Sequence, residues 1–383
     1  MFETGTASGH KDLLNKLNTF LTATGSAFGQ ARSGVGNGRL SDYKGTANSV
    51  AEQFTLTATS ATQFQVYGSK AGDLGVATVG VPFASSRVVF TISAGSTPFQ
   101  AGDTLRLCTA PKWTALRSVA DSEYIWKAPG NDGKGAIYTG LIERSGSGFY
   151  NLRCNGFSGF DAAKSFYDQP GALRYMLPDT YGHPAIALWT GSIPYWFVAD
   201  GRRVIVIAKV SGVYQAAYLG LAEQLTDPLR YPYPLVVGGT VIKDVAYGAN
   251  DPVRSNCFPM AGNTVETYTA QLHMKGTDGN WKRYTTTYEA VDTGTIHPYY
   301  VGDAFRSGMV NLGLNLDGSR PMFPVLLCQF SPADLSGQLA GIHAIPGVGT
   351  ASEQLLTVGP INHLVVQNVH RTGNGDYFSV ALD

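Results

Sequence analysis

Charged residues are scarce in this chain. They make up 15% of its 383 residues, and its 28 basic side chains balance its 28 acidic ones. An average soluble domain carries about 25% charged residues. A neutral chain lacks the electrostatic field that attracts nucleic acid or an anionic membrane surface. The longest uncharged stretch, residues 180–199, is broken by Pro184 and Pro194, which an unbroken membrane-spanning helix does not tolerate. We therefore expect neither nucleic-acid binding nor membrane insertion.

Paired metal-ligand spacings and nucleophile motifs are also missing. The four cysteines are far apart, and the seven histidines include no HExxH pattern. No GxSxG elbow occurs. Two carboxylates could meet in space for glycan cleavage, but every folded protein offers such pairs. We expect no enzymatic activity, no cofactor and no metal. No basic segment followed by an apolar run opens the chain, so we expect no signal peptide. The cysteines are expected to be reduced, partly buried thiols in a protein made in the cytosol.

One helical pattern stands near the N-terminus, in residues 1–24. Leucine and phenylalanine side chains recur there at helical spacing, with polar residues on the opposite face: Leu13, Leu14, Leu17, Phe20 and Leu21. Such an apolar face must be buried. It packs either on the body of its own chain, which we favour, or on a neighbouring subunit.

Excess glycine and abundant aromatic residues point to a β-rich fold with many tight turns. Residues 25–40 are rich in Gly and Ser and predict a flexible linker. Residues 41–110 contain short alternating strands separated by turn signals, which predict a small antiparallel sandwich. Residues 111–383 again read mostly as strands, with a hairpin predicted around Asp200-Gly201 and a third strand over 214–219. The expected fold class is mainly β: an antiparallel sandwich body, an N-terminal amphipathic helix and an inserted sandwich.

Several sequence segments resemble those of a structural protein of tailed bacteriophages. They are FETGTA at 2–7, DLLNKL at 12–17, IPYWFVADGRR at 193–203, YQAAYLG at 214–220, YPYPL at 231–235, NLDGS at 315–319 and LVVQNV at 364–369. The module at 41–110 resembles the immunoglobulin-like sandwiches appended to phage structural proteins, through GVPF at 80–83 and FQAGDTL at 99–105. Relatives of this kind pass from the N-terminal helix almost directly to the WTALR block at 113–117, so the sandwich is an insertion.

The resemblance implies a non-enzymatic virion component of a long-tailed phage. We favour the collar, or neck, at the head–tail junction, where the chain would form a ring with its own copies and contact other neck or tail proteins. The alternative is a baseplate or tail-tip protein that recognises host surface glycan through the 41–110 module. Candidate contact residues between subunits lie in the helix and in the 190–240 region: Leu13, Leu17, Phe20, Tyr195, Trp196, Tyr231 and Tyr233. The alternative for these side chains is packing within the β body.

Overall fold

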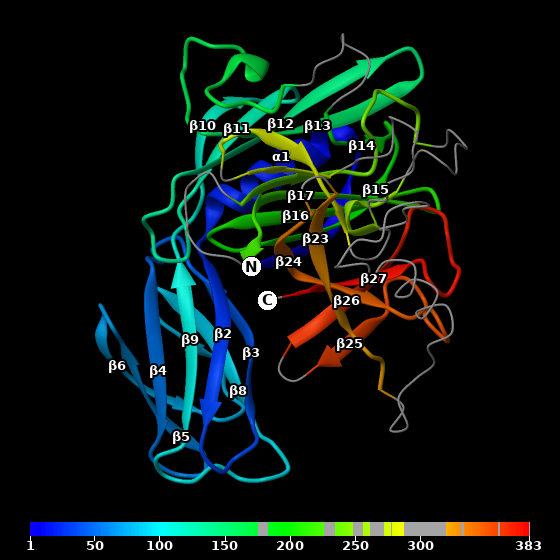
Figure 1. Ribbon diagram of the computed structural model, residues 1–383. Helices are drawn as coiled ribbons and strands as arrows, with labels where there is room; N and C mark the ends of the chain where they lie inside the picture. Colours follow the sequence, from blue (N-terminus) through cyan, green and yellow to red (C-terminus); the bar gives the residue numbers. More distant parts are fainter. Residues whose placement is uncertain are drawn as a thin grey trace.

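The computed structural model describes residues 1–174, 183–225, 234–247, 256–260, 272–276, 278–286, 319–330, 333–358 and 361–382. Over these residues the chain forms antiparallel sheets and a single α-helix, α1 (His10–Ala23), with short 3-10 turns η1 (Phe166–Asp168) and η2 (Phe258–Met260). The predicted fold class, mainly β with an N-terminal amphipathic helix and an inserted sandwich, is confirmed. Figure 1 shows the inserted sandwich standing beside the body rather than within it.

A seven-stranded sheet forms the middle of the body. In spatial order its strands are β1 (Phe2–Ala7), β15 (Ile193–Ala199), β16 (Arg203–Val210), β17 (Val213–Leu221), β19 (Leu235–Gly238), β20 (Leu272–Lys275) and β21 (Trp281–Arg283). The predicted hairpin joins β15 to β16, and the predicted third strand lies in β17. The Asp200 carboxylate fixes the hairpin turn by accepting hydrogen bonds from the backbone N–H groups of Arg202 and Arg203, at 2.6 and 3.0 Å.

The central sheet is covered on both faces, so its middle strands are apolar without alternation. Val204 and Val206 face a core shared with α1 and a five-stranded sheet, whereas Ile205 and Ile207 face a core shared with a C-terminal sheet. The five-stranded sheet contains β10 (Thr114–Val119), β11 (Glu123–Ala128), β12 (Ile137–Gly146), β13 (Phe149–Phe157) and β14 (Ala185–Leu188). The C-terminal sheet runs β22 (Thr285–Thr286), β23 (Phe323–Phe330), β24 (Ala333–Ile345), β27 (Tyr377–Ala381), β26 (Ile361–Gln367) and β25 (Leu355–Val358), with β18 (Glu223–Gln224) beside β24.

The inserted sandwich has its own core. One sheet runs β2 (Ser26–Ser33), β9 (Thr104–Ala110), β4 (Glu52–Ala58), β5 (Gln63–Gly68) and β6 (Gly72–Thr78); the other runs β3 (Arg39–Gly45), β8 (Val88–Ser93) and β7 (Phe83–Ala84). Buried and exposed positions alternate along β4 and β5, as expected of a sheet with one face in a core and one in solvent. Phe54, Phe64 and Phe90 are fully buried between the two sheets.

The segment 25–40 is not a linker, which corrects the predicted boundary. Its residues 26–33 form β2, which pairs with β9 from Ser26↔Ala110 to Ser33↔Thr104. The glycines in this segment allow neighbouring groups to approach its backbone closely and do not make it flexible. A Cβ on Gly25 would lie 2.3 Å from the carbonyl oxygen of Ala110, and Gly34 has φ +117° beside the Asp103 carboxylate. The sandwich therefore spans residues 26–110, and the chain runs almost directly from α1 into its first strand.

Candidate interaction site

The sandwich is joined to the body through two neighbouring strands. β2 begins and β9 ends side by side at Ser26↔Ala110. Just beyond β9, the backbone N–H of Trp113 donates to the carbonyl of Leu21 at 3.0 Å, and its indole N–H donates to the carbonyl of Asp200 at 2.8 Å. Because Trp113 is 2% exposed, it fixes the root of the sandwich in the core of the body. The rest of the sandwich extends away from that root (Figure 1).

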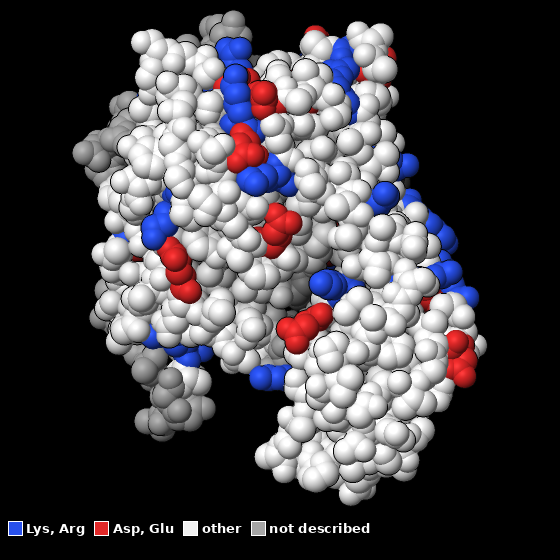
Figure 2. Space-filling model, turned by 180° about the vertical axis from the view of Figure 1, so that it is seen from behind, with Lys and Arg blue, Asp and Glu red and all other residues white. Residues whose placement is uncertain are grey.

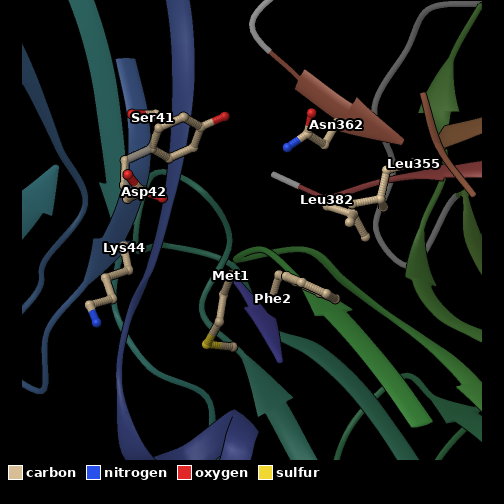
Figure 3. Close-up of a pocket in the computed structure, with 9 residues that line it drawn as sticks. Met1, Phe2, Ser41, Asp42, Lys44, Leu355, Asn362 and Leu382 are labelled. Atoms are coloured by element: carbon tan, nitrogen blue, oxygen red, sulfur yellow. The ribbon is translucent and has the colours of Figure 1, made fainter. Parts of the chain in front are cut away.

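A cleft of about 440 Å³ lies between the sandwich and the body (Figure 3). Small-molecule and peptide sites commonly have volumes in this range. The residues that line it come from the start of the chain, from β3 and from the C-terminal sheet: Met1, Phe2, Ser41, Asp42, Tyr43, Lys44, Leu355, Asn362 and Leu382. Segments more than 300 residues apart in sequence thus meet at one place on the surface.

The two walls of the cleft differ in chemistry. On the sandwich side, Asp42 and Lys44 are exposed and have no ion-pair partner among the described residues. Asp42 has φ +53° within an irregularity of the β3–β8 pairing, between Ser41 and Lys44. On the body side, Phe2 is 40% and Leu355 is 56% exposed. Such a site binds through apolar contact together with hydrogen bonds or ion pairs, and it holds no evident nucleophile with an adjacent base.

One amide is held in place on the body wall. The Asn362 carbonyl accepts a hydrogen bond from the backbone N–H of Leu382 at 2.8 Å, and its side-chain oxygen accepts one from the Thr357 hydroxyl at 2.8 Å. Figure 3 shows the Asn362 side chain directed across the cleft towards the sandwich, with Leu355 and Leu382 below it. The body wall is thus built on the start of β1, on β25 and β26, and on the end of the chain beyond β27.

Ionisable groups elsewhere in the described residues form structural pairs. His10 Nε2 lies 2.9 Å from Glu143 Oε1, in a site where the histidine is 5% exposed. Arg153 makes two hydrogen bonds to the Asp244 carboxylate, at 2.9 and 2.7 Å. Burial lowers the pKa of His183 to about 4, although its Nε2 lies 2.9 Å from the carbonyl oxygen of Leu173. These contacts join α1 to β12, β13 to the loop at Asp244, and residue 173 to residue 183, and they lie away from the cleft lining.

The described thiols and metal-ligating side chains also form no reactive site. Burial raises the pKa of Cys257 to about 11 and also raises the pKa of Cys154, so both thiols stay protonated and unreactive. Across the described ranges, no group of three or more His, Cys, Asp or Glu side chains is placed to hold a metal ion. No helix in the same ranges is long and apolar enough to cross a membrane.

The predicted contact residues of the helix lie inside the chain. Leu13 and Leu17 are each 1% exposed and Phe20 is 5% exposed, in a core shared with the central sheet. The Phe20 ring packs on the Phe197 ring with centroids 5.6 Å apart. Because the helix buries its apolar face on its own body, these three side chains are not available for contacts between subunits. This corrects their assignment as contact candidates and supports the alternative favoured from the sequence.

The other predicted contact residues fall into three groups. Tyr195 is 4% exposed, and its hydroxyl donates to the Glu3 carboxylate at 2.8 Å, so it too is an internal residue. Trp196 is half-buried on the opposite face of β15, where its ring stacks on Tyr214 at 6.4 Å. Tyr231 and Tyr233 lie outside the described residues. Of the predicted set, only Trp196 keeps some exposed surface in the described structure.

Sequence reasoning missed the apolar side chains that are in fact exposed. Phe2 and Leu355 line the cleft, and Val358 is 48% exposed at the end of β25. Residues 111–383 were predicted to be mostly strand, but the tetrapeptide Leu-Leu-Thr-Val at 355–358 looks the same whether it lies in a core or at an edge. The available signal was the lack of any charged or proline residue in this strand, which is unusual for an exposed edge.

Comparison with known proteins gives no family. No family model matches the chain, and no curated protein matches it. Among solved structures it is similar to Xanthomonas campestris FlgL in two crystal forms, C2 and H3, each at 21% identity and a TM-score of 0.19. These matches cover 24% and 23% of this chain and 30% of the FlgL chain. The chain thus spans less than a third of FlgL, and a likeness at this TM-score assigns neither fold nor function.

Proposed function

We propose that this protein is a non-enzymatic structural subunit of a tailed-phage virion. Its place would be the collar at the head–tail junction, where it assembles with its own copies as a ring and stabilises or decorates the connector. Other neck or tail proteins would be its partners. The phrases at 2–7, 193–203 and 364–369 that resemble phage structural proteins supply the family in this proposal.

The observation that carries the proposal is the sandwich held at the side of the body by two adjacent strands. An insertion of this kind adds a projecting arm without altering the fold beneath it. Figure 2 adds a second point of support: on the face seen from behind, charged side chains gather in a few rows and small groups, and wide uncharged areas lie between them. Contacts between subunits favour such surfaces, since desolvating an unpaired charge is costly.

The proposal is tested on purified phage particles. Mass spectrometry should detect this chain in particles from which free protein has been removed, and cryo-electron microscopy should place its density at the neck in multiple copies. The inserted sandwich gives a recognisable arm for fitting. Absence of the chain from infectious particles would refute the virion assignment, whereas density at the baseplate would refute the collar position alone.

One feature favours the tail-tip alternative. Tyr67 is 57% exposed on the solvent face of the sandwich, where it pairs across strands with Thr55, and Gln65 pairs with Thr57 beside it. An exposed ring with hydroxyl and amide groups beside it, and the Asp73 carboxylate opposite it on β6, suits stacking on a sugar whose hydroxyls bind these polar groups. Under this alternative the protein binds host lipopolysaccharide or whole cells, and Tyr67→Ala abolishes that binding, while a protein inert towards both surfaces would exclude it.

A further inference from the structure

Each sheet of the described structure ends in edge strands, and most of these edges are protected. An exposed edge presents unpaired backbone N–H and C=O groups, which natural proteins guard with bulges, charges, prolines or very short strands. In this chain the pairing of four edge strands is interrupted by a register irregularity: β2, β3, β6 and β10. β14 is buried along its length, and β7, β21 and β22 have three residues or fewer.

Two edge strands lack these protections. β1 pairs with β15 in continuous register from Phe2↔Val198 to Ala7↔Ile193 and contains no proline. Its one charged side chain, Glu3, is held by the Tyr195 hydroxyl at 2.8 Å. β25 pairs with β26 in continuous register and contains neither charge nor proline. Four of the six residues of β1 are exposed, and so are three of the four residues of β25, among them Leu355 and Val358.

Both unprotected strands reach the same cleft. Phe2 of β1 and Leu355 of β25 line it, at 40% and 56% exposure, and Val358, 48% exposed, lies at the other end of β25 outside the cleft lining. Apolar residues of this size scattered singly would need no explanation, but here they coincide with the two open edges. The coincidence indicates a surface that is covered in the assembled protein.

The charges on the opposite wall identify what covers it. Asp42 and Lys44 of β3 lie two residues apart, are exposed, and have no ion-pair partner in the described part of the chain. A surface bearing one charge of each sign complements itself when two copies meet about a two-fold axis, because each aspartate then meets the lysine of the other copy. If the axis also passes between β1 and β25, β1 of one copy faces β25 of the other, and the reverse.

We propose that this cleft is an isologous interface with a second copy of the chain. β1 and β25 gain strand partners, and Phe2, Leu355 and Val358 leave water. This inference rests on the self-assembly in the proposed function and names one surface for it: an isologous contact joins copies in pairs, and closing a ring takes head-to-tail contacts in addition. A continuous sheet across two copies would supply backbone hydrogen bonds as well as apolar burial, as in other cases of strand addition.

Sedimentation velocity of the purified full chain over a range of concentrations tests the interface. The wild-type protein should form a dimer that dissociates on dilution. Phe2→Lys and Leu355→Lys, which place a charge on each open edge, should each raise the dissociation constant about tenfold or more. The matched control is Val76→Lys: Val76 is 51% exposed on β6, an edge strand with an irregular register, and this variant should dimerise as the wild type does.

Two results would overturn the interface. One is a wild-type protein that stays monomeric at every concentration, and the other is a dimer weakened no more by Phe2→Lys and Leu355→Lys than by Val76→Lys. Amide hydrogen exchange of the wild type provides a test independent of variant folding: residues 2–7 and 355–358 should become more protected as concentration rises, and unchanged protection contradicts the proposal. Detection of the chain in virions is a separate measurement, so a monomer found in particles would reject the interface and keep the virion assignment.

Discussion

The Glu52 carboxylate and the Arg87 guanidinium form an ion pair of 2.7 Å inside the inserted sandwich. The Glu52 side chain is fully buried, whereas Arg87 keeps 29% of its side chain exposed. The same carboxylate accepts the backbone N–H of Lys70 at 2.6 Å and that of Ala71 at 2.5 Å. One side chain therefore joins the first residue of β4, the turn between β5 and β6, and the approach to β8, so that it couples both sheets of the sandwich.

Replacing Glu52 by Ala should destabilise the sandwich by about 2–3 kcal/mol, because two backbone donors and one guanidinium lose a charged acceptor. Partial exposure of Arg87 keeps the loss below that of a fully buried pair. Urea unfolding followed by circular dichroism measures the change. Gln53→Ala is the matched control, since the adjacent side chain is exposed and its removal should leave stability nearly unchanged. Equal stability of the two variants would contradict this role of Glu52.

The corrected boundary predicts which fragments fold. A fragment of residues 26–110 contains the complete sandwich core and should unfold cooperatively. A fragment of residues 41–110 lacks β2 and should be aggregated or unfolded, because β9 then becomes a bare edge strand and the loop that binds Asp103 is lost. Thermal unfolding by circular dichroism separates the two. A well-folded 41–110 fragment would show that the sandwich folds without β2, as the boundary predicted from the sequence implied.

The body should in turn tolerate removal of the sandwich. Ser26 and Ala110 are direct partners at the root, so a few glycines can join residue 25 to residue 111 without strain. The shortened chain should retain the indole hydrogen bond from Trp113 to Asp200 and the same tryptophan fluorescence as the full protein. A fluorescence maximum shifted to that of an unfolded chain would mean that the sandwich is needed to form the body.

Sequence patterns predicted the elements that form between residues close in sequence, and missed the features that depend on packing between distant segments. The helix face at Leu13 and Leu17 and the hairpin at Asp200-Gly201 follow from spacing within a few residues, and both predictions are confirmed. β2 was missed because its small residues, such as Ala27 and Gly29, carry too little hydrophobic signal to alternate visibly. The pairing of β1 with β15 joins segments about 190 residues apart, and no periodicity encodes it. The cleft depends on that pairing, so it could not be read from the sequence.

Thiol reactivity should follow burial. Burial raises the pKa of Cys154, Cys257 and Cys108, and the first two are completely buried whereas Cys108 is half-buried. With a disulfide reagent near neutral pH, we expect Cys154 and Cys257 to stay unmodified in the native protein and to react once it is unfolded, with Cys108 reacting at an intermediate rate. Peptide mapping by mass spectrometry assigns each site. Fast native modification of Cys154 would show that the body opens readily.

Mild acid should destabilise the body before the sandwich. Burial lowers the pKa of His183 to about 4 and that of His273 to about 3, from an ordinary value of 6.5. Below about pH 6.5 these histidines take up protons in the unfolded chain but stay neutral in the folded body. The free energy of unfolding of the body is therefore highest above about pH 6.5. It falls as the pH drops towards the pKa values of the folded state. His183 alone accounts for a loss on the order of 3 kcal/mol at the acid end of this range.

The sequence supplies the probe for this prediction. Residues 26–110 contain no histidine, and all five tryptophans lie outside them, so tryptophan fluorescence reports on the body alone. Urea midpoints followed by fluorescence should decline from pH 7 to about pH 4, and His183→Gln should flatten part of that decline. Amide exchange in 26–110, corrected for its intrinsic pH dependence, should stay constant over the same interval. A parallel loss of protection in both parts would indicate that the body and the sandwich unfold as one unit, and a decline unchanged by His183→Gln would show that burial of this histidine is not its cause.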